Sequence, residues 1–127
     1  MANDLHTAVR GWLTYIMPDV VARLLKHITI DFLLELSKEP TIHGPYSIGI
    51  EKLRGPITRI NFYIVATDDA MVLATTATIK DAPEDYKPTL YFDMFFFIED
   101  FPTEIADAYH LQQLVDTLTD QYQEVTA

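Results

Sequence analysis

Hydrophobic residues in this chain have helical spacing near both ends, and the segments between are typical of strands. Over residues 5–25 the apolar side chains recur every three or four positions, which is typical of an amphipathic helix. Pro18 interrupts that run, so we expect a helix over about residues 4–27 with a break near residues 17–18, where the proline would either start a second helix or kink one long helix. A second apolar stripe with helical spacing covers residues 105–125, and Thr103 before it is a suitable helix cap.

Between the two helical segments the sequence predicts strands. Residues 28–36 alternate as expected for a strand with one buried face, residues 60–67 and 71–80 are rich in β-branched and aromatic residues, and residues 89–98 form another strand. Residues 46–54, bracketed by two Gly-Pro steps, are a short strand or a flap. We interpret residues 28–36 as a strand because a continued helix would place Asp31 and Glu35 on its apolar stripe. Short turns such as Asp68-Asp69 imply an antiparallel sheet of about five strands. The sequence therefore predicts one two-layer α+β domain over residues 1–127, with helices at both ends of the chain.

The residue types exclude several kinds of chemistry. Cysteine is absent, which removes disulfides and thiolate nucleophiles. No serine lies in a nucleophile motif, no glycine-rich phosphate loop is present, and the four histidines lack the spacing of a zinc site. We therefore expect no metal and no cofactor, and the pattern favours a non-enzymatic protein. The N-terminus lacks a signal-peptide pattern and no apolar run approaches about 20 residues, so we expect a cytoplasmic protein without membrane contact.

The net charge of −10 comes entirely from the last third of the chain. Residues 1–80 carry eight acidic and eight basic side chains, whereas residues 81–127 carry eleven acidic side chains and one lysine. This distribution argues against direct binding to nucleic-acid phosphates, which requires Lys and Arg. It is compatible with simple solubility or with attraction to a basic protein partner. On the last helix, the acidic surface would consist of Asp107, Asp116, Asp120 and Glu124.

The predicted strand over residues 89–98 carries aromatic residues on both faces. One face is wholly apolar and would pack on the helices; it carries Leu90, Phe92, Met94, Phe96 and Ile98. The other face is mixed and holds Tyr91, Asp93, Phe95, Phe97 and Glu99. The neighbouring strand adds either Tyr63 and Val65 or Phe62 and Ile64 to it, depending on register. Aromatic side chains exposed there would mark an interface or a pocket. Three interpretations stay open: residues 38–59 fold over this face, a second copy covers it in a homo-oligomer (a dimer first of all), or a ligand or foreign partner binds there.

A different set of residues allows a pocket between helix and sheet. These residues are His27, Asp31, Tyr46, Tyr63 and Tyr91. Such a pocket would suit a small-ligand-binding or enzymatic α+β domain, although buried tyrosines with bonded hydroxyls explain the same residues. The leading hypothesis is a self-associating, non-enzymatic protein–protein interaction module, such as a viral or phage accessory protein or an inhibitor. The alternatives are the pocket-containing domain and an acidic mimic of nucleic acid, because fold alone does not assign function.

Overall fold

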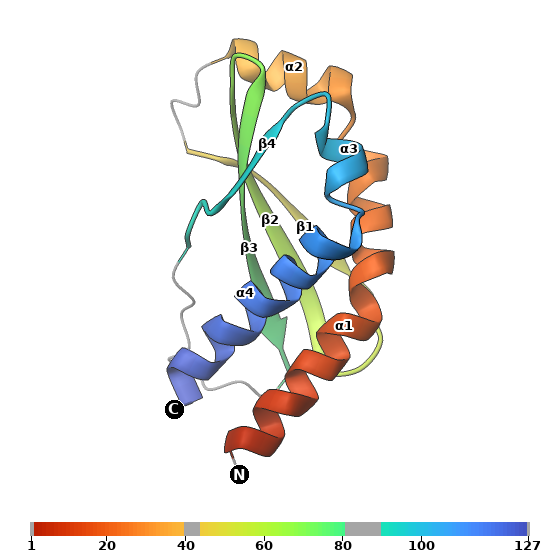
Figure 1. Cartoon of the computed structure of the whole chain (residues 1–127), viewed down its shortest axis with the longest axis vertical. Helices are drawn as coiled ribbons and strands as arrows, with labels where there is room; N and C mark the ends of the chain where they lie inside the picture. The colour runs from red at the N-terminus through yellow and green to blue at the C-terminus, as the bar shows by residue number, and fades with distance from the viewer. Residues whose placement is uncertain (1, 40–43, 81–89, 127) are drawn as a thin grey trace.

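The computed structural model describes residues 2–39, 44–80 and 90–126, which form an α+β fold around a four-stranded antiparallel sheet (Figure 1). The elements are α1 (Ala2–His27), α2 (Ile30–Lys38), β1 (Tyr46–Glu51), β2 (Ile57–Thr67), β3 (Ala70–Ile79), β4 (Met94–Phe97), α3 (Phe101–Glu104) and α4 (Ala108–Thr126). Along the sheet the strands lie in the order β1-β2-β3-β4. The predicted α+β class and the antiparallel sheet are confirmed, and the described residues form four strands instead of about five.

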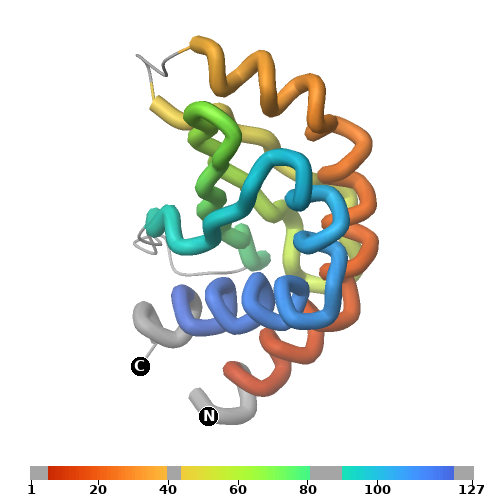
Figure 2. The backbone as a smooth tube through the Cα atoms, turned by 45° about the horizontal axis from the view of Figure 1, so that its top comes forward, coloured from red at the N-terminus to blue at the C-terminus, as the bar shows by residue number. Residues whose placement is uncertain are grey.

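The helices form one layer and the sheet forms the other (Figures 1 and 2). α1 and α4 pack against each other, while α2 contacts β2 and α4 contacts β3. We call the sheet face toward the helices the inner face, and the opposite one the outer face. The inner face and the helices share one hydrophobic core, which includes Leu13, Val20, Leu24, Leu33, Phe62, Ile64, Leu73, Phe96, Leu114 and Leu118. The outer face therefore lies on the side away from this core.

The hairpin of β2 and β3 is the longest part of the sheet. Thr67 pairs with Ala70, so a two-residue turn joins the strands, as the sequence predicted. Asp68 in this turn has a φ of 53°, a left-handed conformation that aspartate tolerates better than most residues. The register places Val65 opposite Val72, and both side chains lie on the outer face. The hairpin thus sets which apolar side chains appear outside.

The prediction of a strand over residues 28–36 is wrong, because α2 forms there. α1 ends two residues before α2 begins, and this short non-helical step changes the phase of the apolar stripe. Thr29 caps the new helix, since its side-chain oxygen accepts a hydrogen bond from the backbone N–H of Phe32 at 3.1 Å. After the change of phase Asp31 and Glu35 are both exposed. Asp31 and Glu35 would lie on the apolar stripe only if α1 continued through these residues without interruption.

A second helix does not start at Pro18, since α1 continues through the proline as one helix. A proline inside a helix removes a backbone hydrogen bond and costs about 3 kcal/mol. Here Met17 on one side and Val20 on the other are both buried in the core. Each fully buried side chain of this size contributes roughly 1.5–3 kcal/mol. Packing on both sides of the proline therefore offsets the lost hydrogen bond.

The strand predicted over residues 89–98 is shorter, because β4 has only four residues. Its first residue, Met94, pairs with Leu73 of β3. Leu90 and Phe92 were predicted to face the core but are exposed instead. Residue 89 lies outside the described residues. The inward face of this segment is therefore reduced to the apolar side chains from Met94 onward.

The last helical segment is divided into α3 and α4 rather than beginning at Thr103. Phe101 of α3 is buried, and its ring packs edge-to-face on Phe96 with centroids 5.2 Å apart. This contact ties α3 to the end of β4. α4 then begins after Asp107, whose carboxylate accepts a hydrogen bond from the backbone N–H of His110 at 2.9 Å. Asp107, and not Thr103, is therefore the N-cap of the long helix.

Residues 38–59 were one possible cover for the outer face. In the structure, β1 extends the sheet beside β2 and does not cross that face. Residues 40–43 lie outside the described part of the chain. Within the described residues, the segment therefore enlarges the sheet and leaves its outer face open.

Candidate interaction surface

The outer face carries neighbouring apolar side chains on three strands, and no described helix covers them. We call this group the outer patch, and it consists of Tyr63, Val65, Val72, Phe95 and Phe97. Val65, Val72 and Phe95 lie directly opposite one another on β2, β3 and β4. Phe95 and Phe97 are 57% and 58% exposed, and their rings pack edge-to-face with centroids 5.3 Å apart. Cross-strand neighbours lie about 5 Å apart, so these side chains form a contiguous surface.

A hydrogen-bonded polar group lies at the β1 side of the outer face. The Arg59 guanidinium donates to the Glu51 carboxylate at 2.6 Å and to the Asn61 side chain at 2.7 Å. Gly49 makes room for it, because a Cβ built there would lie only 2.3 Å from an Arg59 nitrogen. The guanidinium thus lies across β1. The signal in the sequence was a glycine inside a strand, which often marks a close approach.

Tyr63 and Tyr91, which were both predicted as contact residues, lie in different parts of the structure. Tyr63 belongs to the outer patch, where it is half-buried. Tyr91 is exposed but precedes β4, in a segment that the structure does not assign to a strand. The register places Tyr63 and Val65, rather than Phe62 and Ile64, in the patch beside Phe95 and Phe97, and Val72 joins them.

The acidic side of α4 is partly engaged within the chain. Asp116 forms an ion pair with Arg10 of α1 and accepts a hydrogen bond from Gln112 at 3.0 Å. Burial raises the pKa of Asp116, but hydrogen bonds from Gln112 and Arg10 outweigh this effect and hold the pKa below its usual value. Asp120 is exposed. The side chain of Glu124 lies outside the described part, so Asp120 is the carboxylate that clearly remains available to a partner.

Asp107 likewise has a structural role at the start of α4. The backbone N–H of His110 donates to its carboxylate, and this bond is the main reason that the pKa of Asp107 is lowered. The His110 ring nitrogen Nδ1 lies 2.9 Å from the same oxygen and acts in the same direction. The His110 ring in turn contacts Phe96, with centroids 5.0 Å apart. Asp107 thus helps to fasten α4 beside β4.

The residues predicted to line a helix–sheet pocket do not come together. They are His27, Asp31, Tyr46, Tyr63 and Tyr91. Tyr46 and Tyr63 lie on opposite faces of the sheet, because they occupy alternating positions in the paired strands. His27 and Asp31 are exposed where α1 meets α2, and Tyr91 precedes β4.

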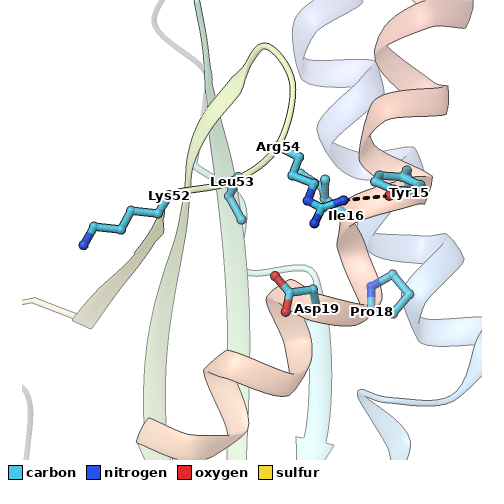
Figure 3. A pocket seen from close by; sticks show the side chains of 7 residues that line it. All are labelled: Tyr15, Ile16, Pro18, Asp19, Lys52, Leu53 and Arg54. Atoms are coloured by element: carbon cyan, nitrogen blue, oxygen red, sulfur yellow. Dashed lines mark hydrogen bonds between the residues drawn. The ribbon is translucent and has the colours of Figure 1, made fainter.

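A pocket of about 470 Å³ is found elsewhere, where α1 passes the connection between β1 and β2 (Figure 3). It is lined by Tyr15, Ile16, Pro18, Asp19, Lys52, Leu53 and Arg54. Arg54 reaches from the connection toward α1, where its Nη1 lies 3.4 Å from the Tyr15 hydroxyl. Sequence reasoning missed this site. The available signal was Tyr15, an aromatic residue off the apolar stripe of the first helix, which is 68% exposed.

Neither a metal site, a membrane-spanning helix nor a likeness to known proteins assigns a function to the described part of the chain. In residues 2–39, 44–80 and 90–126, no three His, Asp or Glu side chains gather in a way that could hold a metal. No helix in that part is long and apolar enough to cross a membrane. No known protein family matches the chain, and neither a curated protein nor a solved structure is detectably similar to it. The outer patch and the pocket beside α1 are therefore the features that bear on function.

Proposed function

We propose that this protein is a non-enzymatic interaction module that forms a homodimer through the outer patch. The supporting observation is that the helices pack on the inner face and leave Phe95 and Phe97 more than half exposed. A phenylalanine exposes roughly 200 Å² when free, so each ring leaves about 115 Å² in water. At about 25 cal/mol per Å², burying that area is worth roughly 3 kcal/mol per ring. A symmetric contact buries two such rings from each copy.

The size of the outer face suits such a contact. β2 has 11 residues, which at about 3.4 Å per residue gives a length of roughly 37 Å. Four strands spaced about 4.8 Å apart give a width of roughly 19 Å. Because β1 and β4 are shorter, the projected area of the whole face is roughly 600 Å². Ala74 and Thr76 on this face are already buried, so a partner would cover the remainder. Stable interfaces bury about 800 Å² per partner, so this contact would lie at the small end of the range.

The distribution of charge favours the outer face over the helical side for self-association. The Glu51–Arg59 ion pair makes the β1 side of the outer face polar without adding net charge there. The acidic helix α4 lies on the inner side of the sheet. Two sheets stacked by their outer faces lie about 10 Å apart, with the helices another ~10 Å beyond each sheet. The two acidic helices are then roughly 30 Å apart, several times the Debye length of about 8 Å.

The experiment is a light-scattering mass measurement after size exclusion, at protein concentrations from about 10 µM to roughly 500 µM. We expect the wild-type chain to have the mass of two chains. We expect the double variant Phe95→Ser, Phe97→Ser to have the mass of one chain over the same range, because it removes the two most exposed rings of the patch. Circular dichroism confirms that the variant keeps its fold.

The matched control is Tyr109→Ser, which removes an exposed aromatic ring from α4, away from the outer face. This variant should keep the mass of two chains. A wild-type mass of one chain at the highest concentration would contradict the proposal. A two-chain mass for the double serine variant would show that self-association uses another surface, and that result too would reject the outer patch.

A further inference from the structure

The pocket beside α1 contains an arginine without an acidic partner among the described residues. The chain has four arginines, and three of them pair with a carboxylate: Arg10 with Asp116, Arg23 with Asp19, and Arg59 with Glu51. Arg54 is the fourth, and its hydrogen bond within the described residues goes to the Tyr15 hydroxyl. In a chain with 19 acidic side chains, an arginine without such a partner that lines a pocket is the exception. Its charge is available to a ligand.

The backbone that carries Arg54 is held in place. Arg23 of α1 donates hydrogen bonds to the carbonyls of Glu51 at 2.7 Å and Lys52 at 3.3 Å. Lys52 has a φ of 57°, a left-handed backbone conformation that residues other than glycine and asparagine rarely adopt. These bonds fasten the connection to α1, and Leu53 packs against the core beside it. The backbone at Arg54 is therefore held in place before a ligand binds, which reduces the conformational entropy lost on binding.

The remaining lining defines the chemistry of the pocket. Asp19 is already balanced by Arg23, whose Nε lies 3.2 Å from its carboxylate. The side chain of Lys52 extends away from Tyr15, so Arg54 supplies the uncompensated positive charge on that side (Figure 3). The Tyr15 ring and Leu53 provide apolar surface around it. A volume of about 470 Å³ lies within the usual range of small-ligand sites, about 300–1,000 Å³.

We propose that this pocket binds a monoanionic carboxylate attached to an apolar or aromatic group. A guanidinium matches a carboxylate through two parallel N–H···O hydrogen bonds, and Arg54 has donors left for them. The apolar body of the ligand would then pack on Tyr15 and Leu53. A phosphate dianion fits less well, because Arg54 alone supplies an uncompensated positive charge on the Tyr15 side, where the Lys52 side chain extends away (Figure 3). The site is separate from the outer patch, so the two proposals stand independently.

The test is a titration followed by amide chemical shifts in ¹H–¹⁵N NMR spectra of the whole chain. The probes are 3-phenylpropionate, a free acid, and N-acetylphenylalanine, which carries the carboxylate of a peptide C-terminus. We expect saturable shifts at Leu53 and Arg54, with dissociation constants on the order of 1 mM for at least one probe. The neutral amide of the same probe should bind at least tenfold more weakly. Tighter binding of 3-phenylpropionate would indicate a free metabolite as the source of the carboxylate, and tighter binding of N-acetylphenylalanine would indicate a peptide C-terminus.

Two arginine variants separate this site from general attraction of anions. Arg54→Gln should weaken binding at least tenfold, and because Arg54 is exposed its loss should leave the rest of the spectrum unchanged. Arg59→Gln removes the same charge from the outer face and should change binding by less than about twofold. The proposal is overturned if neither acid gives saturable shifts, if Arg54→Gln binds as well as wild type, or if the amides bind equally well. Equal or tighter binding of inorganic phosphate would reject the carboxylate class.

Discussion

Replacing Leu33 and Ile30 separately with alanine tests the placement of α2. Leu33 is 0% exposed, whereas Ile30 is 36% exposed. A strand over the same residues would give the opposite order, because Ile30 would alternate toward the core and Leu33 would face away from it. The ratio of the two stability losses therefore distinguishes the helix from the strand without a new structure.

The expected losses follow from burial. Leu33→Ala removes a fully buried side chain and leaves a cavity, which costs roughly 3 kcal/mol. Ile30→Ala removes three carbons of a side chain that is already partly in water, worth roughly 1.5 kcal/mol. Alanine also has a higher helix propensity than isoleucine and returns about 0.4 kcal/mol. We therefore expect a net loss of about 1 kcal/mol for the second variant.

Urea unfolding followed by far-ultraviolet circular dichroism measures both losses. With a denaturant slope of about 2 kcal/mol/M, Leu33→Ala should lower the midpoint by about 1.5 M and Ile30→Ala by about 0.5 M. All samples need the same protein concentration, since self-association would couple stability to concentration. Equal losses, or a larger loss for Ile30→Ala, would refute the helical placement of these residues.

Two further predictions concern single contacts. Thr29→Ala removes the side-chain oxygen that caps α2 and should lower the free energy of unfolding by about 1 kcal/mol, whereas Thr29→Ser should restore it; no difference between the two would show that the cap contributes nothing. Asp116→Asn should cost less than about 1 kcal/mol at neutral pH, because the ion pair with Arg10 is about half exposed. The folded-state pKa of Asp116 lies below its unfolded value of about 3.9, so the pair stabilises above that pH and loses its effect as the pH falls through the folded-state pKa. A stability difference between wild type and variant that persists at lower pH would contradict this assignment.

Local patterns were sufficient for much of the fold. The β-branched and aromatic residues of β2 and β3, with the Asp68-Asp69 turn between the strands, predict the central hairpin because β propensity and turn chemistry are short-range properties. The side-chain period of two in a strand predicts that Phe95 and Phe97 share one face of β4, which the structure leaves exposed. The first candidate site could thus be anticipated from consecutive residues.

The strand predicted over residues 28–36 failed where one local rule competed with another. Alternation and helical spacing are both compatible with these residues once the helix restarts at Thr29, and the deciding cap is a single hydrogen bond. Leu33 is buried only because α2 then packs on β2. Length and periodicity alone cannot determine this, because the phase of a new helix is set by where it begins.

The sequence by itself determined the helices near both ends, the central hairpin, the acidic last third and the shared face of Phe95 and Phe97, because each depends on neighbours within a few positions. Only the tertiary structure decided which distant residues meet. Arg10 and Asp116 are 106 positions apart, and Arg54 and Tyr15 are 39 positions apart. These contacts exist because α1 packs on α4 and passes the β1–β2 connection. Neither arrangement leaves a periodic trace in the chain, so the second candidate site became visible only in three dimensions.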